Sequence, residues 1–270
     1  LEGAYLSNSL MDRSKILLQR LPFIEQGVDY STSPVPGSPD LVDVDIDLEY
    51  RMPGQFSFGV GYSGLQKLLL NGNIIHSNFL GSGDRVAVRL NSGRYQKIYS
   101  VSHTDPYRTM DRVSRTVSLT HQDIAQFTSA ASDFSTASTS AAVDYSYPIT
   151  DYQRLSFGVS YQRSQLLASA GSTAQAQEWV ANNGTQFTEV VDNRYRFSGT
   201  EFDSFEMLLS WQFDSRNASL FPTRGTRQQL FLSTVVPGSS VEYFQARYLF
   251  TKYIPITQKW LIRLNAETGI

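Results

Sequence analysis

The chain of 270 residues contains no cysteine. This absence excludes disulfide bonds, thiolate metal sites and a cysteine nucleophile. Long hydrophobic runs are also missing: the longest is a few residues around Leu68, far short of the roughly 20 that a membrane-spanning helix needs. A basic field is missing as well, because 25 Asp and Glu balance 23 Lys and Arg. The charge balance therefore gives no reason to expect a nucleic-acid partner.

Motifs for catalysis are scarce too. His76, His103 and His121 fall on three different expected strands without an acidic residue at ligand spacing, which disfavours a zinc site. No Gly-x-Ser-x-Gly nucleophile motif occurs. Residues 59–64 match the glycine fingerprint of dinucleotide-binding proteins, but that fingerprint needs a following helix, and here another strand is expected. We therefore expect no enzyme activity, no cofactor and no metal.

The sequence does contain a strong two-residue alternation. Large apolar residues alternate with small or polar ones between residues 54 and 63. Side chains of a strand point to opposite faces in turn, so one face of this segment is apolar and the other polar. Similar segments follow without intervening helices, which predicts an antiparallel meander. The eleven expected strands are 54–62, 66–78, 84–94, 96–105, 114–122, 137–147, 153–164, 201–214, 227–235, 242–254 and 259–270.

Strand length and loop asymmetry favour a membrane barrel over a soluble sandwich. Strands of about 9–13 residues exceed the usual 5–6 of globular sheets and match a tilted bilayer crossing. Among the intervening connections is the long excursion 165–200, in which 173–182 could form a short helix. Tight turns on the periplasmic side and long loops outside are typical of outer-membrane barrels. The compact or Pro-, Gly- and Asp-rich connections are 79–83, 105–113, 148–152, 214–226 and 255–258.

Residues 1–52 differ from the rest. A helix is expected over 7–20 and a short strand over 27–32. Residues 42–48 alternate apolar side chains with Asp, which predicts a half-buried strand with a solvated acidic face. The order helix, strand, turn, strand predicts part of a small α+β module, on the same side as the tight turns. We therefore divide the chain into 1–52 and a barrel region, 53–270.

Several motifs, taken in chain order, resemble the Omp85 family. The turn 78–84, NFLGSGD, is similar to the turn between the second and third barrel strands of that family. Residues 35–40 and the strand after them resemble the end of its last POTRA domain, and 54–62 resemble its first barrel strand. Further segments resemble its periplasmic turns and outer loops: 104–107, 147–149, 221–226, 236–239 and 253–256.

This resemblance implies a fold for the whole chain. It would be mainly β, an antiparallel up-and-down transmembrane β-barrel with about eleven of sixteen strands present, preceded by the C-terminal part of a POTRA domain. The family's loop with an Arg-Gly-Phe tip is absent from this sequence. The sequence starts without a signal peptide and ends on a strand without a turn, so we expect an internal part of a longer protein.

The resemblance also implies a function. Proteins of this kind fold and insert β-barrel proteins into the bacterial outer membrane without ATP, with the POTRA part in the periplasm. The implied partners are unfolded β-barrel clients, outer-membrane lipoproteins and the lipid bilayer, with no nucleic acid. An alternative is a secretion translocator of the same family, either of the two-partner type or TamA-like. A barrel lipase would need a Ser/His pair, and an ordinary porin would lack the α+β module.

The candidate site is the first barrel strand. Its glycines weaken strand pairing and packing, so we hypothesise a labile seam whose exposed edge templates an incoming client strand. In the POTRA part, Glu2 is a candidate contact for a lipoprotein partner. The candidate residues of the seam are Gly54, Gln55, Phe56, Ser57, Phe58, Gly59, Val60, Gly61 and Tyr62.

Overall fold

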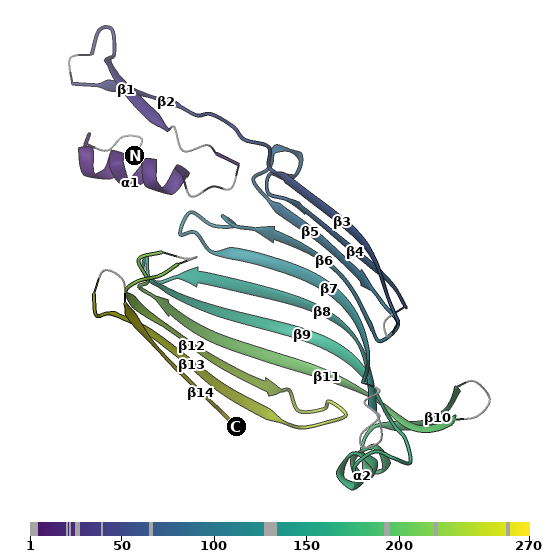
Figure 1. The fold of residues 1–270 in the computed structure, drawn as a ribbon. Helices are drawn as coiled ribbons and strands as arrows, with labels where there is room; N and C mark the ends of the chain where they lie inside the picture. The colour runs from purple at the N-terminus through teal and green to yellow at the C-terminus, as the bar shows by residue number, and fades with distance from the viewer. Residues whose placement is uncertain are drawn as a thin grey trace.

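The structure, a computed structural model, consists of one large curved sheet with a small α+β module at one end (Figure 1). The large sheet has 12 strands, and all of their pairings are antiparallel. No helix among the described residues has the length and hydrophobicity to cross a membrane. The described residues are 5–19, 21, 23–24, 28–38, 40–64, 67–126, 134–191, 195–218, 221–257 and 260–270.

The N-terminal module has the expected order of elements. Met11, Ile24 and Val28 form its buried apolar positions. Lys15 forms an ion pair of 2.8 Å with Asp29, and this hydrogen bond raises the pKa of the lysine. The helix expected over 7–20 is confirmed, and the first strand lies two residues later than expected. The bounds are α1 Asn8–Gln19, β1 Asp29–Pro34 and β2 Val42–Asp47.

The expectation that β2 is half-buried is wrong. Its apolar side chains are exposed, with values of 45% for Val42, 37% for Val44 and 42% for Ile46. Alternation decides which face each side chain takes, but a face is buried only where another layer packs on it. β1 and β2 form a two-stranded sheet, and no second layer covers this row in the described part of the chain. The acidic face is exposed, as expected.

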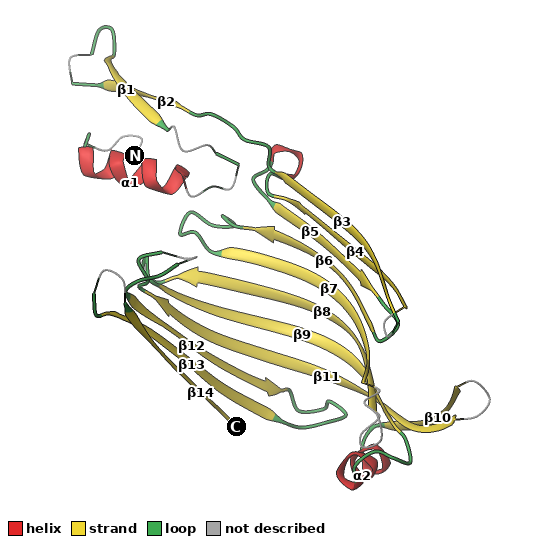
Figure 2. Ribbon diagram, in the orientation of Figure 1, coloured by secondary structure: helices red, strands yellow, loops and turns green. Residues whose placement is uncertain are grey.

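The eleven expected strands of the meander are confirmed, with shifted ends. Each pairs with its neighbour in the chain, and β3 and β14 form the two edges of an open, curved sheet (Figure 2). One strand was not expected: β10 lies inside the excursion and pairs with β11. The bounds are β3 Gly54–Ser63, β4 Lys67–His76, β5 Arg85–Ser92, β6 Gln96–Asp105, β7 Ser114–Gln126, β8 Phe134–Pro148, β9 Gln153–Ala168, β10 Thr185–Val191, β11 Tyr195–Asp214, β12 Gly225–Val235, β13 Phe244–Pro255 and β14 Leu261–Gly269.

The sheet has two ends, which we call proximal and distal. The proximal end carries the α+β module, and the distal end carries β10 and the helix α2, Ala174–Asn182 (Figure 1). All five connections expected on the side of the module lie at the proximal end. The distal connections after β3 and β5 are also short. The difference in connection length between the two ends therefore comes mainly from the excursion between β9 and β11.

Asparagine side chains fix two of the proximal turns. In the turn after β4, Asn78 Oδ1 accepts a hydrogen bond of 2.8 Å from the Gly83 N–H. In the turn after β11, Asn217 Oδ1 accepts from the N–H groups of Thr223 and Arg224, both at 3.0 Å. An Asn amide that binds backbone groups in this way substitutes for missing backbone pairing in a turn. These contacts join the strands in a fixed register.

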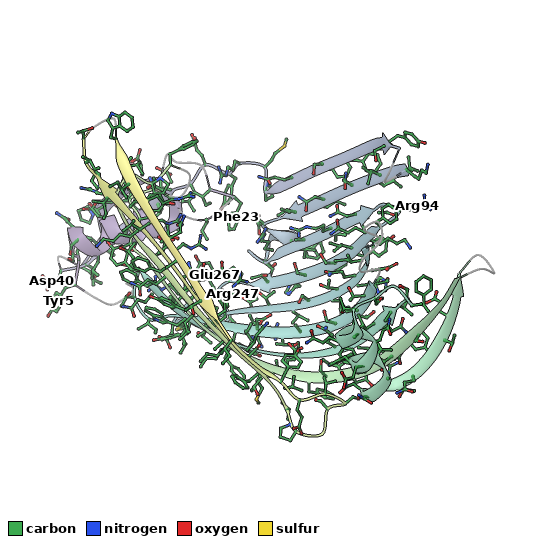
Figure 3. The ribbon with its side chains drawn as sticks, turned by 60° about the horizontal axis from the view of Figure 1, so that its bottom comes forward. Tyr5, Phe23, Asp40, Arg94, Arg247 and Glu267 are labelled. Atoms are coloured by element: carbon green, nitrogen blue, oxygen red, sulfur yellow. The ribbon has the colours of Figure 1, made fainter. Side chains whose placement is uncertain are left out.

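The register gives the sheet one apolar and one polar face. Apolar side chains on neighbouring strands stand opposite each other on the convex face, while Ser, Thr, Asn and Gln dominate the other. Arg247 and Glu267 form an ion pair on the concave, polar side, with a hydrogen bond of 2.7 Å (Figure 3). Pairs on the apolar face of β9 and β11 are Leu155 with Trp211, Phe157 with Leu209, and Val159 with Met207.

The excursion packs against the distal end of the sheet. The expected helix at 173–182 is confirmed as α2, whose first turn is capped by Thr173 Oγ1 accepting from Ala176 N at 3.3 Å. Trp179 of α2 lies edge-on against Phe202 of β11, with ring centroids 5.1 Å apart. Val180 of the same helix is buried. These contacts hold α2 against β9 and β11.

β11 is paired along both edges by an unusual succession of partners. One edge pairs with β9 from Ser198 to Phe213, and the other meets β10, then residues 236–240, then β12. In the middle section, Val236 N donates to Phe205 O at 2.7 Å and Ser240 N donates to Asp203 O at 3.0 Å. Nearby, Tyr243 donates a hydrogen bond to Glu206, and burial raises the pKa of Tyr243.

Candidate functional site

All nine residues predicted for the seam lie on β3, at an edge of the sheet. Within the described residues, β3 pairs with β4 alone, in a register that sets Gly54 opposite His76 and Tyr62 opposite Leu68. The other predicted contact, Glu2, lies outside the described residues. The structure therefore brings the seam residues together and leaves one edge of their strand open.

One hydrogen bond fixes which backbone groups of β3 are free. Ser77 N donates to Pro53 O at 2.9 Å, one position before the pair Gly54–His76. Hydrogen-bonded and non-bonded pairs alternate along an antiparallel ladder. Every second residue from Gln55 on therefore bonds to β4, and the residues between them direct N–H and C=O toward the open edge. These open-edge residues are Gly54, Phe56, Phe58, Val60 and Tyr62.

The open-edge residues also carry the apolar side chains of the strand. Phe56 is 73% exposed, Phe58 64%, Val60 61% and Tyr62 74%. None of the open-edge residues is proline, so each offers both a donor and an acceptor. The strand therefore presents unpaired backbone and a continuous apolar row on the same residues. Such an edge can add one further strand by main-chain pairing.

The concave side of β3 is lined by small residues. A Cβ at Gly59 would lie 4.0 Å from Asn71 Cβ, and one at Gly61 would lie 3.7 Å from Leu69 Cβ. Both distances are ordinary van der Waals contacts, so neither glycine is required for space. Their effect is instead on the strand, because glycine has the most backbone freedom to lose and no side chain to pack.

The histidines singled out by sequence do not form a common site. His103 Nε2 lies 3.0 Å from Asp84 Oδ2 at the proximal end, and His121 Nδ1 lies 2.9 Å from Thr139 Oγ1 farther toward the distal end. No cluster of three or more His, Asp or Glu side chains suited to a metal ion occurs among residues that the structure describes. Residues 59–64 begin in a strand and lead into β4, so the dinucleotide interpretation has no helix to support it.

Sequence reasoning found the strand but not its open-edge residues. Alternation identifies the two faces of a strand, whereas the direction of each N–H depends on the pairing register with its neighbour. That register is visible only once the bond between Ser77 and Pro53 is known. No signal within β3 itself distinguishes the two sets of backbone groups.

Comparisons with known proteins agree with this geometry. The Omp85 superfamily domain matches residues 78–270. The chain is 24% identical over 273 residues to "Outer membrane protein assembly factor BamA" of Neisseria meningitidis serogroup B (strain ATCC BAA-335 / MC58), covering 100% of this chain and 33% of that protein. It is similar to the crystal structure of BamA from Haemophilus ducreyi lacking POTRA domains 1–3, with a TM-score of 0.77 and 26% identity over 100% of this chain and 50% of that one. The chain thus spans a third of the curated relative and half of the solved one.

Proposed function

The chain belongs to the Omp85 superfamily, and we propose that it is part of an outer-membrane protein that folds and inserts β-barrel clients without ATP. The printed name of the curated relative, an outer-membrane protein assembly factor, supports this proposal. The proposed barrel has sixteen strands, begins at residue 53 and lies in the outer membrane. Residues 1–52 are proposed to be POTRA sequence in the periplasm, with lipoproteins as partners. No specific observation favours the secretion translocator.

The backbone direction of β3 is the observation that carries the proposal, because Gly54, Phe56, Phe58, Val60 and Tyr62 direct their N–H and C=O groups away from β4. In hydrocarbon, an unpaired N–H or C=O costs several kcal/mol, so a strand edge there must be paired. A client strand lying antiparallel to β3 would satisfy the N–H and C=O groups of the open-edge residues. Its lipid-facing side chains would then extend the apolar row of Phe56, Phe58 and Val60. Templating and burial of the client's backbone would occur in one step.

The proposed seam must also release its previous partner. Gly59 and Gly61 favour release, because a strand with glycine at these positions has less side-chain packing to lose on opening. No charged residue occurs on β3, so the strand can remain in contact with lipid while it is open. The seam is therefore proposed to open at low cost and to be closed again by a client or by the protein's own last strand.

A proline scan separates the templating edge from the rest of the strand. Val60→Pro in the full-length protein removes one N–H from the open edge and leaves the ladder to β4 intact. Proline is tolerated on edge strands where its nitrogen faces away from the ladder. We expect the variant to fold, and client assembly to slow by about fivefold or more, in line with a lost hydrogen bond of roughly 1 kcal/mol plus the steric bulk of the ring. Assembly of a client barrel into vesicles measures the effect.

Two variants serve as controls. Val60→Ala shortens the side chain but keeps the N–H, and we expect nearly normal assembly. Gly59→Pro removes an N–H that bonds to β4, and we expect loss of folding rather than selective loss of assembly. Normal assembly by a folded Val60→Pro protein would refute templating at this edge.

A further inference from the structure

The concave face beside the seam contains a hollow lined by polar side chains. Its volume is about 340 Å³, and it extends over the strands β3, β4 and β5. We call it the seam hollow. The residues that line it from the concave face are Ser57, Gly59, Asn71, Asn73, Arg89 and Asn91.

The register of the three strands brings these residues together. Gly59, Asn71 and Asn91 stand opposite one another in one row across the sheet, and the other three residues form the next row toward the proximal end. Residues that stand opposite each other share a face, and so do residues two apart on one strand. The two rows therefore form one patch on the concave side.

The sheet itself leaves the polar groups of the hollow unused. In the part of the chain that the structure describes, the side chains of the three asparagines and of Arg89 form no hydrogen bond or ion pair. An asparagine amide has two N–H donors and a guanidinium has five. No Asp or Glu lines the hollow, so the charge of Arg89 is not balanced there. The hollow therefore offers several donors and one positive charge to a group from outside the sheet.

Other arginines of the sheet do have carboxylate partners. Arg247 on the concave face pairs with Glu267 of the neighbouring strand, and Arg163 pairs with Asp203. Arg89 differs from both, because the residue opposite it on β4 is Asn73 and the one on β6 is Ser100. An acidic partner for Arg89 would have to come from another strand.

Gly59 makes the hollow accessible from the open edge of β3. A strand added at that edge would lie about 10 Å from β4, because neighbouring strands are roughly 4.8 Å apart. Its residue opposite Gly59 would point to the concave side. Since Gly59 has no side chain, a long side chain at that position can pass over β3 toward Asn71 and Arg89. A Cβ at Gly59 would lie 4.0 Å from Asn71 Cβ, so a larger side chain there would cover the asparagine.

We propose that the seam hollow is a subsite for one acidic side chain of the client strand, a glutamate whose carboxylate binds Arg89 and the asparagine amides. The proposal rests on the templating function proposed above and adds a preference for charge to it. Hydrogen bonds between a guanidinium and a carboxylate are stronger than neutral ones. A lysine at the same client position would be repelled by Arg89. Barrel strands carry polar residues on their inner face, so a glutamate there is compatible with a client barrel.

Binding of strand peptides to the full-length protein in dioleoylphosphatidylcholine vesicles tests the subsite. Short fluorescent peptides alternate valine and threonine, and one central threonine is replaced by glutamate, glutamine or lysine. Fluorescence anisotropy gives the Kd of each peptide. We expect the glutamate peptide to bind about tenfold more tightly than the glutamine peptide, and the lysine peptide to bind most weakly.

Variants of Arg89 test the source of the preference. Arg89→Gln should reduce the ratio of the two Kd values to about twofold or less, and Arg89→Glu should make the lysine peptide bind more tightly than the glutamate peptide. Arg85→Gln is the matched control. Arg85 lies on the same strand and face, nearer the proximal end and outside the hollow, so we expect the preference for glutamate to be unchanged.

Two glycine variants test the path across β3. Gly59→Val should lower the preference for glutamate, because the valine side chain would cover the hollow. Gly61→Val, at the next position on the same face but outside the hollow, should retain it. The ratio of Kd values is compared in each variant, since a valine in β3 changes the pairing of all peptides alike.

The variant Val60→Pro distinguishes failure of the subsite from failure of templating. We expect it to weaken all three peptides to a similar extent. If the peptides respond in this way but glutamate and glutamine bind equally, or if the preference survives Arg89→Gln, the subsite is refuted and templating stands. If no peptide binds, or if binding is insensitive to Val60→Pro, templating at β3 is refuted and the subsite with it.

Discussion

Gly225 controls the shape of the turn that joins β11 to β12. Its φ is +110°, and a Cβ there would lie 2.4 Å from the carbonyl oxygen of Ser215. Only glycine avoids both the conformational penalty and the collision. The turn also depends on Asn217, which binds the backbone of Thr223 and Arg224.

We expect Gly225→Ala to destabilise the full-length protein by about 2 kcal/mol or more, because left-handed strain alone costs roughly 1–2 kcal/mol and the collision adds to it. Urea unfolding of the protein in lipid vesicles measures the change. Gly238→Ala is a matched control: its φ is +99°, but no atom lies within 4 Å of the added Cβ. Equal losses in the two variants would contradict a role for the contact with Ser215.

At the residue scale, the sequence predicted where residues lie better than it predicted which groups they contact. The segment 221–226 was recognisable as a turn motif, yet nothing in it indicates that Gly225 approaches Ser215, ten residues earlier. The predicted seam residues lie where expected, on β3. The direction of the Val60 backbone groups and the cross-strand ion pair of Lys97 with Asp123 became visible only with the register of the sheet.

At the scale of the element, β3 has weak side-chain packing, because glycine occupies positions 59 and 61 of the strand. We expect Gly59→Val/Gly61→Val to stiffen the seam, because valine favours strands by about 1 kcal/mol per site over glycine and a Cβ at either site makes only ordinary contacts. If opening limits the rate, client assembly slows on the order of tenfold. Kinetics of client insertion into vesicles provide the measurement.

Gly171→Val is the control for this double variant. Gly171 lies in the distal excursion, where an added Cβ would meet only Ser169 Oγ, at 3.6 Å. Gly171→Val is the same type of substitution far from the seam, and we expect the kinetics of client insertion to be unaltered. A normal rate for the seam variant would show that weak packing of β3 is unimportant for opening.

Strands with one apolar face were predictable, whereas the distal extension of β11 and its partner β10 were not. The expected strand 201–214 was found, but β11 begins six residues earlier, at Tyr195. Its extension pairs with β10, whose sequence TQFTEVV shows little alternation. Alternation arises where one face meets an apolar phase. β10 lies at the distal end, and its sequence does not show this pattern.

At the scale of the whole molecule, stability should fall from the middle of the sheet toward β3. The strands β8, β9 and β11 have 15, 16 and 20 residues and are paired on both edges. Local opening is easiest where a strand has few neighbours. The edge strand β3 has one neighbour among the described residues and no charged or buried anchor.

Hydrogen exchange of the full-length protein in vesicles can measure this gradient. We expect the slowest exchange in β8 and β9. Within β3, amides of open-edge residues such as Phe58 and Val60 should exchange at least tenfold faster than those of Ser57 and Gly59, because only the latter bond to β4. Equal protection of the two sets would mean that the seam is firmly closed.

The antiparallel sheet and its strand order followed from the sequence, whereas the environment of the N-terminal module did not. The apolar row of β2 was expected to be half-buried, yet Val42, Val44 and Ile46 are exposed. Pattern reasoning assumes that every apolar face has a covering layer. That layer need not belong to the same stretch of chain, and alternation contains no information about it.

The direct pairing of β9 with β11 has a consequence for engineering. The two strands are in continuous register from Ser198–Ala168 to Phe213–Gln153, so the wall is complete without the intervening excursion. Foreign peptides grafted near Gly171 would be carried outside that wall, while the strand order of the sheet stays as it is. The excursion is thus a natural insertion point for displayed cargo.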